Sequence, residues 1–304
     1  MGTLFRIKLY ARDEQQAQSG FHAAFERVAA IDSALSDYKP DSELSQLSER
    51  AVQHPVMVGD DLFKVLSASQ KLAGETDGAF DITMGPLTRL WREARRQRRV
   101  PEQADVQQAL SRCGFQKLHI DAADHTVELD TAGMQLDAGG IAKGYAADEA
   151  LSLLRRNSIS SALVAASGDL AFSDAPPGQR GWKVGIDSYD SANAPFTRIV
   201  QLENAAVSTS GDTEQHLDAG GVRYSHIINP KTGTGLTSPL TVTVVARHGT
   251  DADALATAIS VLGLRKGRAL VESKPDTAAL MVLREPGKTL IEETSRFRAM
   301  TGNK

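Results

Sequence analysis

The 304-residue chain contains one cysteine, Cys113, and only 5% aromatic residues. A single cysteine excludes an intrachain disulfide framework and any zinc or iron–sulfur site built from several cysteines. No stretch approaches the roughly 20 consecutive apolar residues that a membrane-spanning helix needs. Basic residues are not in excess either, because 34 Lys and Arg stand against 38 Asp and Glu, for a net charge of −4. Without a global positive field, the chain is not expected to bind nucleic acid.

The residues that are present are typical of a folded globular protein. Apolar residues make up 41% of the chain and charged residues 24%, and a chain of this length buries roughly 75% of its unfolded surface. One local basic run contains five arginines between Arg92 and Arg99. A contact with a phosphate backbone is the functional interpretation of this run. The absence of interleaved aromatic residues favours a solvated helix end or loop.

Apolar periodicity predicts blocks of helices and blocks of strands. Alternation over residues 5–9 predicts a strand, and three-to-four spacing from Phe21 to Leu35 predicts a helix. Further helices are expected at about 60–75 with Asp60 as N-cap, from Pro101 as the first helical residue with Gly114 just past the end, at 139–156 and at 251–264. Further strands are expected at 117–120, 126–130, 184–186, 199–202, 206–209, 213–217, 222–228, 240–246, 278–283 and 289–293. This grouping predicts an α+β fold and one continuous domain, residues 1–304.

A glycine-rich segment, LDAGGIAKGYAAD, extends from Leu136 to Asp148. It combines an acid at the end of a strand, two glycines and the start of a helix. Glycines allow close approach of a ligand, and a helix N-terminus offers free N–H groups, so a pyrophosphate could dock here. The alternative is a tight turn without a ligand, because the segment is neither the dinucleotide fingerprint nor a Walker loop.

Two further segments carry polar side chains suited to chemistry. Asp253 and Thr257 stand four residues apart in DADALATA, which places two hard oxygen donors suited to Mg²⁺ on one helix face. Capping is the alternative role, since helix starts favour acids. His226 in YSHIINPKTG is a candidate general base. No G-x-S-x-G motif or Cys/His pair supports covalent hydrolase chemistry.

Two aromatic residues could contribute to a binding site. GAFDITMGPL, residues 78–87, is interpreted as an irregular binding loop or as an ordinary turn around a buried Phe80. Tyr38 could offer a flat face for ring stacking, with core packing as the alternative.

The order of these motifs resembles the ApbE family, the FAD:protein FMN transferases, over roughly residues 1 to 283. The resemblance rests on MGT at the start, SDYKPDSELSQLS, GAFDITMGPL, LDAGGIAKGYAAD, SGDL, VSTSGD, YSHIINPKTG and DADALATAISVLG. It implies an α+β, T-fold-like domain with a mostly antiparallel sheet and packed helices. It also implies an enzyme that binds FAD with Mg²⁺, transfers the FMN half to a threonine of a target protein and releases AMP.

The resemblance also implies roles for individual residues. The FAD-contacting positions are Met1, Tyr38, Ala79, Phe80, Asp81, Asp137, Lys143 and Ile227. The metal ligands are Asp253, Thr257 and the backbone carbonyl of Gly140. His226 is the candidate base for the target threonine, with Asp137, Asp212 or no base at all as alternatives. One departure is Ser167 in LVAASGD, where many members carry a Gly-Gly-Asp turn.

The partners and location follow from the same resemblance. The expected partner is a target flavoprotein subunit of a membrane redox complex or a similar carrier domain, and no membrane span is expected in this chain. Relatives usually carry an export signal, which implies a periplasmic or outer-face, membrane-anchored location, with the cytoplasm as the alternative. Two other functions stay open, a pyrophosphatase that splits FAD into FMN and AMP, and an FAD-binding protein without turnover.

Overall fold

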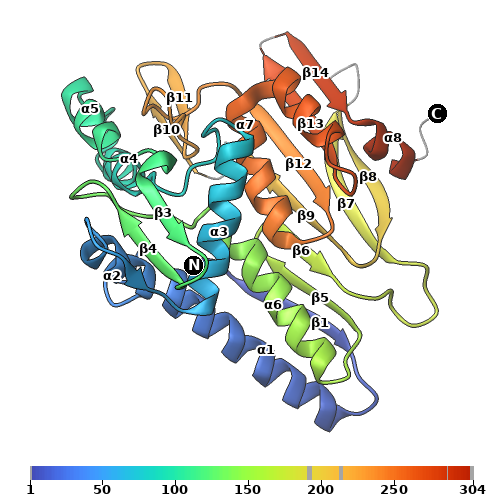
Figure 1. Cartoon of the computed structure of the whole chain (residues 1–304). Coiled ribbons are helices and arrows are strands. Elements are labelled where there is room, and N and C mark those ends of the chain that lie inside the picture. The colour runs from blue at the N-terminus through green and yellow to red at the C-terminus, as the bar shows by residue number, and fades with distance from the viewer. Residues whose placement is uncertain (1, 190–193, 212–214, 286, 302–304) are drawn as a thin grey trace. The chain divides into compact units, whose positions relative to one another are not determined.

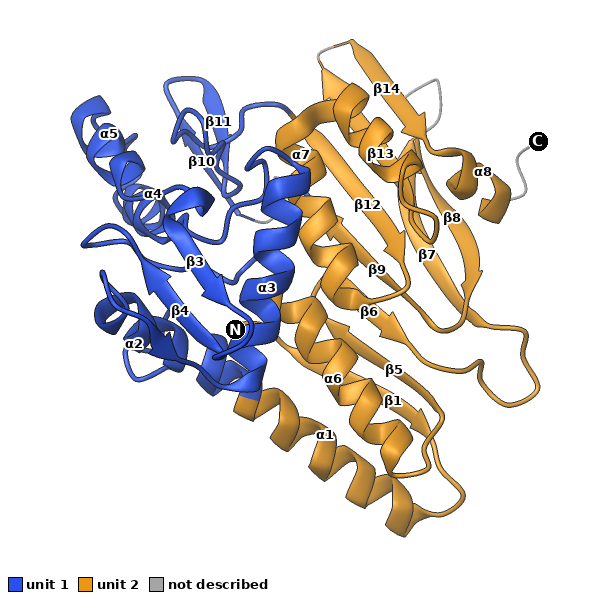
Figure 2. Ribbon diagram, viewed as in Figure 1, with its two compact units in different colours: residues 1, 31–140, 211–238 blue, residues 2–30, 141–210, 239–304 orange. Residues whose placement is uncertain are grey.

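The computed structural model describes residues 2–189, 194–211, 215–285 and 287–301 (Figure 1). The chain forms two compact units, and each unit combines segments that are distant in the sequence (Figure 2). Unit 1 contains residues 31–140 and 211–238, whereas unit 2 contains residues 2–30, 141–210 and 239–304. The expected single domain of residues 1–304 stays a prediction.

Unit 2 is built on a seven-stranded sheet in the order β1-β5-β6-β9-β12-β13-β14, and all its neighbouring strands are antiparallel. The strands are β1 (Phe5–Tyr10), β5 (Ser161–Ala166), β6 (Asp169–Phe172), β9 (Ala205–Ser210), β12 (Leu240–Ala246), β13 (Ala278–Glu285) and β14 (Lys288–Glu293). This large antiparallel sheet with its packed helices confirms the α+β prediction. The strands β5 and β6 were not among those predicted from periodicity.

The two faces of this sheet are covered differently. Helices α6 (Ala142–Arg156) and α7 (Gly249–Glu272) lie side by side on one face, and α1 (Glu14–Leu35) belongs to unit 2 up to Ala30 (Figure 1). Side chains alternate along a strand, so the other set, which includes Val245 and Leu280, forms a second core. This core is completed by the hairpin β7 (Trp182–Tyr189)–β8 (Pro195–Leu202) and by Phe297 of α8 (Ser295–Thr301). The backbone of α7 departs from helical geometry at Gly263, where φ is 73°.

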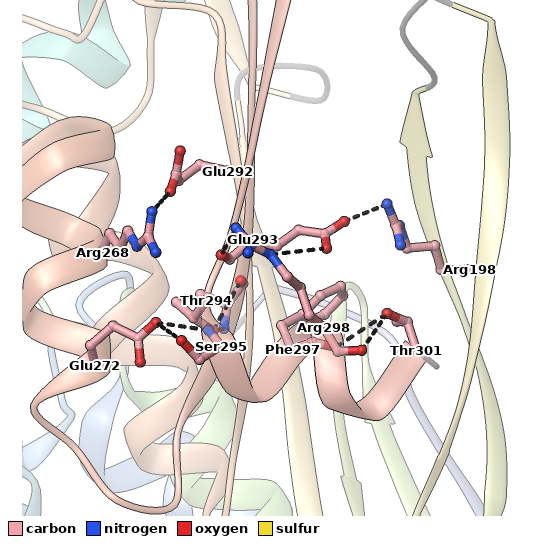
Figure 3. A network of polar contacts seen from close by, with 11 residues as sticks. Arg198, Arg268, Glu272, Glu292, Glu293, Thr294, Ser295, Phe297, Arg298 and Thr301 are labelled. Atoms are coloured by element: carbon pink, nitrogen blue, oxygen red, sulfur yellow. Dashed lines mark hydrogen bonds and ion pairs between the residues drawn. The ribbon is translucent and has the colours of Figure 1, made fainter. Parts of the chain in front are cut away.

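A polar network holds α8 at the end of the sheet (Figure 3). The buried carboxylate of Glu293, the last residue of β14, forms an ion pair with Arg198 of β8. The carboxylate of Glu272, at the end of α7, accepts hydrogen bonds from the backbone N–H and the hydroxyl of Ser295, at 2.7 and 2.9 Å. Arg298 of α8 lies 3.9 Å from the Glu293 carboxylate, so α8 is tied to both a strand and a helix of unit 2.

Unit 1 consists mainly of helices with small sheets. Its elements are α2 (Glu43–Arg50), α3 (Asp60–Glu75), α4 (Gly85–Gln97), α5 (Gln103–Ser111), the 3₁₀ turn η1 (Phe115–Lys117), and the sheets β2 (Val56–Met57)–β4 (Thr126–Leu129)–β3 (Leu118–Asp121) and β10 (His216–Ala219)–β11 (Val222–Ser225). Trp91 of α4, Val106 of α5 and Leu217 of β10 pack in one apolar cluster. The indole N–H of Trp91 donates a hydrogen bond of 2.8 Å to the carbonyl of Gly233.

Several local predictions need correction. Gly59, not Asp60, is the N-cap of α3, and its N–H is bound by the Glu43 carboxylate. Helix α5 begins at Gln103, so Pro101 lies before the helix. The segment expected as a loop becomes helical at Gly85, with Pro86 in the first turn of α4. Among the described residues, no helix is long and apolar enough to cross a membrane.

Candidate active site

The site residues expected from the sequence form two groups, one within each unit. Unit 1 holds Tyr38, Ala79, Phe80, Asp81, Asp137, Gly140, His226 and Ile227, and unit 2 holds Lys143, Asp253 and Thr257. Met1 and the alternative base Asp212 lie outside the residues that the structure describes.

The group in unit 2 is a buried cluster of two acids around one lysine. The Lys143 Nζ lies 3.0 Å from Asp253 Oδ1 and 3.0 Å from Asp169 Oδ2. The N–H of Gly144 donates to Asp253 Oδ2 at 3.2 Å, and the hydroxyl of Ser208 donates to Asp169. The side chains of Asp253 and Asp169 are only 4% and 7% exposed. Two carboxylates share one ammonium, so the ionised cluster carries one surplus negative charge.

Burial and the charges within the cluster shift the pKa values of its members. Burial raises the pKa of Asp253 to about 6, the charge of Asp169 acts in the same direction, and Lys143 opposes both. Burial alone would lower the pKa of Lys143, but the adjacent Asp253 and Asp169 raise it above its ordinary value. Thr257 follows Asp253 by one helical turn and is partly exposed. Helix α7 therefore presents a carboxylate and a hydroxyl at a place where the surplus negative charge of the cluster favours the binding of a cation.

Helices α6 and α7 hold the cluster in place through two residues of the glycine-rich segment. Asp148 caps the start of α7, where it accepts hydrogen bonds from the N–H groups of Gly249 and Thr250 at 2.7 and 2.9 Å. Gly144 lies so close to α7 that an added Cβ would stand 2.0 Å from the carbonyl oxygen of Gly249. Both residues therefore serve the packing of the helix pair that carries Lys143 and Asp253.

The group in unit 1 contains an aromatic ring covered by a guanidinium. The Tyr38 side chain is 63% exposed, and Arg92 Cζ lies 4.1 Å from the centroid of its ring. Arg92 is fixed by an ion pair with Asp37, and its Nη2 lies 3.6 Å from Asp137 Oδ2. Arg92 thus links two expected site residues, Tyr38 and Asp137. Sequence pattern alone does not indicate this role, because Arg92 begins a run of arginines whose composition favours a solvated helix end or loop.

Asp137 also shapes the glycine turn that follows it. Its Oδ1 accepts a hydrogen bond of 2.8 Å from the N–H of Gly139. Its own N–H donates to the carbonyl of Ile82 at 2.8 Å. These bonds tie the turn at Gly139 and Gly140 to the segment that contains Phe80 and Asp81.

Asp81 is already fully engaged inside unit 1. Its carboxylate accepts hydrogen bonds from the N–H and hydroxyl of Thr83, at 2.8 and 2.7 Å, and from the N–H of Phe115 at 2.9 Å. Burial raises its pKa above the ordinary value in spite of these bonds. Ala79 and Phe80 are buried beside it. Asp81 therefore holds the segment together, and its contact with FAD stays a prediction.

His226 follows β11 and is partly exposed. Both its backbone N–H and its ring Nδ1 face the carbonyl of Gln215, at 3.1 and 3.2 Å. Because a carbonyl only accepts, this contact requires the proton on Nδ1, and the neutral ring then has its lone pair on Nε2. The neighbouring Ile227 is buried. The geometry is compatible with a general base, a role that stays a prediction.

Comparisons with known proteins agree with this fold. The family model described as "ApbE family" matches residues 1–281. A Treponema pallidum protein named FAD:protein FMN transferase is 36% identical, over 93% of this chain and 82% of the relative. The crystal structure of Pseudomonas stutzeri flavinyl transferase ApbE in its apo form has a TM-score of 0.87 and 31% identity, with 99% of this chain and 94% of that chain covered. The flavin transferase ApbE from Vibrio cholerae also has a TM-score of 0.87, at 28% identity, with 99% and 96% covered.

The fold and the comparisons define the class of this protein, which is an α+β enzyme and a transferase. The chain belongs to the ApbE family. The resemblance stated from the sequence motifs is thereby confirmed.

Proposed function

We propose that this protein transfers the FMN half of FAD to a threonine of a target flavoprotein and releases AMP. The named relatives are FAD:protein FMN transferases, and the match covers most of their length. The observation that carries the proposal is the buried Lys143–Asp169–Asp253 cluster with its surplus negative charge, in which Asp253 stands on the same helix as Thr257.

The residues of this cluster fit Mg²⁺. Asp253 and Thr257 offer hard oxygen ligands, and the carbonyl of Gly140, three residues before Lys143, is the further ligand that the family resemblance implies. Within the described parts of the chain, no three His, Cys, Asp or Glu side chains gather as a metal site. Mg²⁺ usually needs only one or two carboxylates, with water and substrate phosphates completing its shell. When bound, it would supply charge neutralisation at the pyrophosphate.

The chemistry itself is an exchange at phosphorus. The threonine oxygen forms a bond to the FMN phosphorus, the bond from that phosphorus to the bridging oxygen breaks, and AMP leaves with that oxygen. The threonine proton must go to a base, and Nε2 of His226 is our candidate. The ring of Tyr38, with Arg92 held by Asp37 beneath it, is the proposed stacking surface for the isoalloxazine.

The proposed reaction can be tested with one assay. The protein is incubated with FAD, Mg²⁺ and a carrier domain that presents an acceptor threonine, and AMP and the intact mass of the carrier are followed together. We expect AMP release and an FMN-sized mass gain, both lost in Asp253→Asn and on chelation of Mg²⁺. Asp251→Asn is the matched control, because Asp251 is an exposed acid on the same helix. It should retain both signals.

Other outcomes would contradict the proposal. Release of AMP with no mass gain on any acceptor would identify an FAD pyrophosphatase, and bound FAD without AMP would identify a binding protein. Undiminished transfer in His226→Ala would remove this histidine from the mechanism, leaving Asp137, Asp212 or no base.

We also propose an acceptor that is a subunit of a membrane redox complex or a similar carrier domain, and a periplasmic or outer-face location. The support is the resemblance to family members that usually carry export signals. Fractionation of the source cells with an antibody against this chain tests the location. Recovery of the protein with cytoplasmic markers would contradict it.

A further inference from the structure

Arg95 of α4 is a partly buried cation whose side chain has no hydrogen bond or ion pair to any residue that the structure describes. Two neighbouring arginines differ, since Arg92 pairs with Asp37 and Arg96 with Glu93. A guanidinium carries five N–H donors, and partial removal of such a group from water without a partner costs free energy. Burial and the like charge of Arg92 accordingly lower the pKa of Arg95.

Arg95 lies one helical turn from Arg92, whose guanidinium covers the exposed ring of Tyr38. It follows Arg92 by three residues, so the two side chains are neighbours on the surface of α4. The groups whose charges act on Arg95 are Arg92 and Tyr38. The guanidinium of Arg92 already has partners, because it covers the Tyr38 ring and contacts the carboxylates of Asp37 and Asp137. The guanidinium of Arg95 therefore offers N–H donors, which no described residue uses, near a flat and exposed aromatic surface.

The chemistry of this pair indicates the kind of ligand that it would take. An exposed ring suits a planar partner, and a planar fork of donors suits adjacent acceptor atoms on the edge of that partner. The second guanidinium, Arg92, disfavours a cationic ligand at the same place. The pyrimidine edge of an isoalloxazine ring meets both requirements, because it carries carbonyl oxygens and an electron-rich ring nitrogen.

We propose that Arg95 binds the pyrimidine edge of the isoalloxazine ring that stacks on Tyr38, and so fixes the orientation of the flavin. This inference rests on the proposed function, which places a flavin on Tyr38. Arg95 is thus a ligand-contacting residue that the family resemblance did not imply.

Arg95→Gln tests the proposal through binding alone. The full-length protein and the variant are titrated with riboflavin and with FAD, and flavin fluorescence reports the bound fraction. We expect the dissociation constants for both flavins to rise by a similar factor of about ten, since riboflavin contains the ring without any phosphate. Arg89→Gln is the matched control, because Arg89 is an exposed arginine on the same helix and lines a separate groove with Arg112. It should bind both flavins like the wild type.

A second readout separates ligand contact from a structural effect. A cation beside the pyrimidine edge stabilises the anionic reduced ring. The midpoint potential of bound riboflavin should therefore be more negative in Arg95→Gln than in the wild type, while the melting temperature of the unliganded protein does not fall. Loss of affinity for FAD alone would indicate a phosphate contact and overturn the proposal, as would unchanged binding of both flavins. If the wild type binds neither flavin, the proposed function itself fails.

Discussion

At the scale of single residues, Asp81 shows how burial can outweigh hydrogen bonding. Its three accepted hydrogen bonds favour the ionised form, yet burial raises its pKa above the ordinary 3.8. The folded protein therefore holds this proton to a higher pH than the unfolded chain does. The contribution of Asp81 to the free energy of unfolding is fully present below about pH 4 and declines as the pH rises through the raised pKa.

Asp81→Asn makes this dependence measurable, because the amide does not titrate. The free energy of unfolding, from urea denaturation, is compared for wild type and variant between about pH 4 and pH 7. The wild-type value minus the variant value should fall with rising pH and then level off. The Asn side chain also presents a donor to one of the N–H groups that Asp81 accepts from, so the variant should be less stable by about 1–3 kcal/mol. A pH-independent difference would contradict the raised pKa.

Ser167 is the other residue with a testable backbone consequence. It is the first of the two residues between β5 and β6, and its φ is 57°, in the left-handed region that favours glycine. Ser167→Gly should raise the free energy of unfolding by about 0.5–1 kcal/mol in urea denaturation. The exposed Ser160, whose φ is not positive, is the control, and Ser160→Gly should lower stability instead. Lower stability of Ser167→Gly would show that the serine side chain matters more than the strain.

The sequence predicted some of the site residues and missed others for a clear reason. Lys143, Asp253 and Thr257 stand in segments with a distinctive local pattern, and the structure brings Lys143 and Asp253 into contact. Asp169 and Arg92 were not predicted as site residues. Their partners lie far away in the sequence, and no local pattern of residue types reports a contact over such a separation.

At the scale of elements, the glycine contact between α6 and α7 sets the geometry of the acid–lysine cluster. A methyl group at Gly144 would stand 2.0 Å from the Gly249 carbonyl oxygen, so Gly144→Ala must push the helices apart. We expect a loss of about 3 kcal/mol or more in the free energy of unfolding. Gly74→Ala is the control, because Gly74 is an exposed residue of α3 with open space around it. It should stabilise the protein by about 1 kcal/mol through helix propensity. Equal effects of the two substitutions would contradict the close approach.

The elements that periodicity missed share a physical cause. The strand β5 has mostly small, apolar residues on both faces, so its sequence lacks the apolar–polar alternation of a half-buried strand. Helix α4 begins with Gly85 and Pro86, which favour a turn in isolation but also suit the first turn of a helix. Long elements with a clear period, such as α3 and β12, were placed within a residue or two.

At the scale of the whole molecule, the α+β class followed from the grouping of helices and strands, but the division into two units did not. Each unit combines segments separated by long stretches of the other unit. Local periodicity carries no information about which distant segments share a core. The motif order identified the family, and with it the antiparallel sheet, where periodicity alone could give only the class.

This interleaving predicts that residues 31–140 cannot fold alone. The apolar cluster around Trp91 is completed by Leu217 and Ile228, and the Trp91 indole is hydrogen-bonded to Gly233. All three partners belong to residues 211–238. Without them, the isolated segment should show no cooperative unfolding transition and the emission of a solvent-exposed tryptophan. Tryptophan emission from the isolated segment comes from Trp91 alone, because the chain has only two tryptophans and the other, Trp182, lies outside the segment.

Joining residues 211–238 to this segment through a flexible linker should restore a cooperative transition and shift the Trp91 emission to shorter wavelength. Gly233→Ala in the joined fragment is a sharp control. Gly233 has a φ of 71°, and an added Cβ would stand 2.7 Å from Val106. The substitution should therefore loosen the packing of this core and make the unfolding transition of the joined fragment less cooperative. A cooperative transition in residues 31–140 alone would mean that the helices carry a sufficient core of their own. In that event the second segment would contribute residues to the site without contributing to the fold of unit 1.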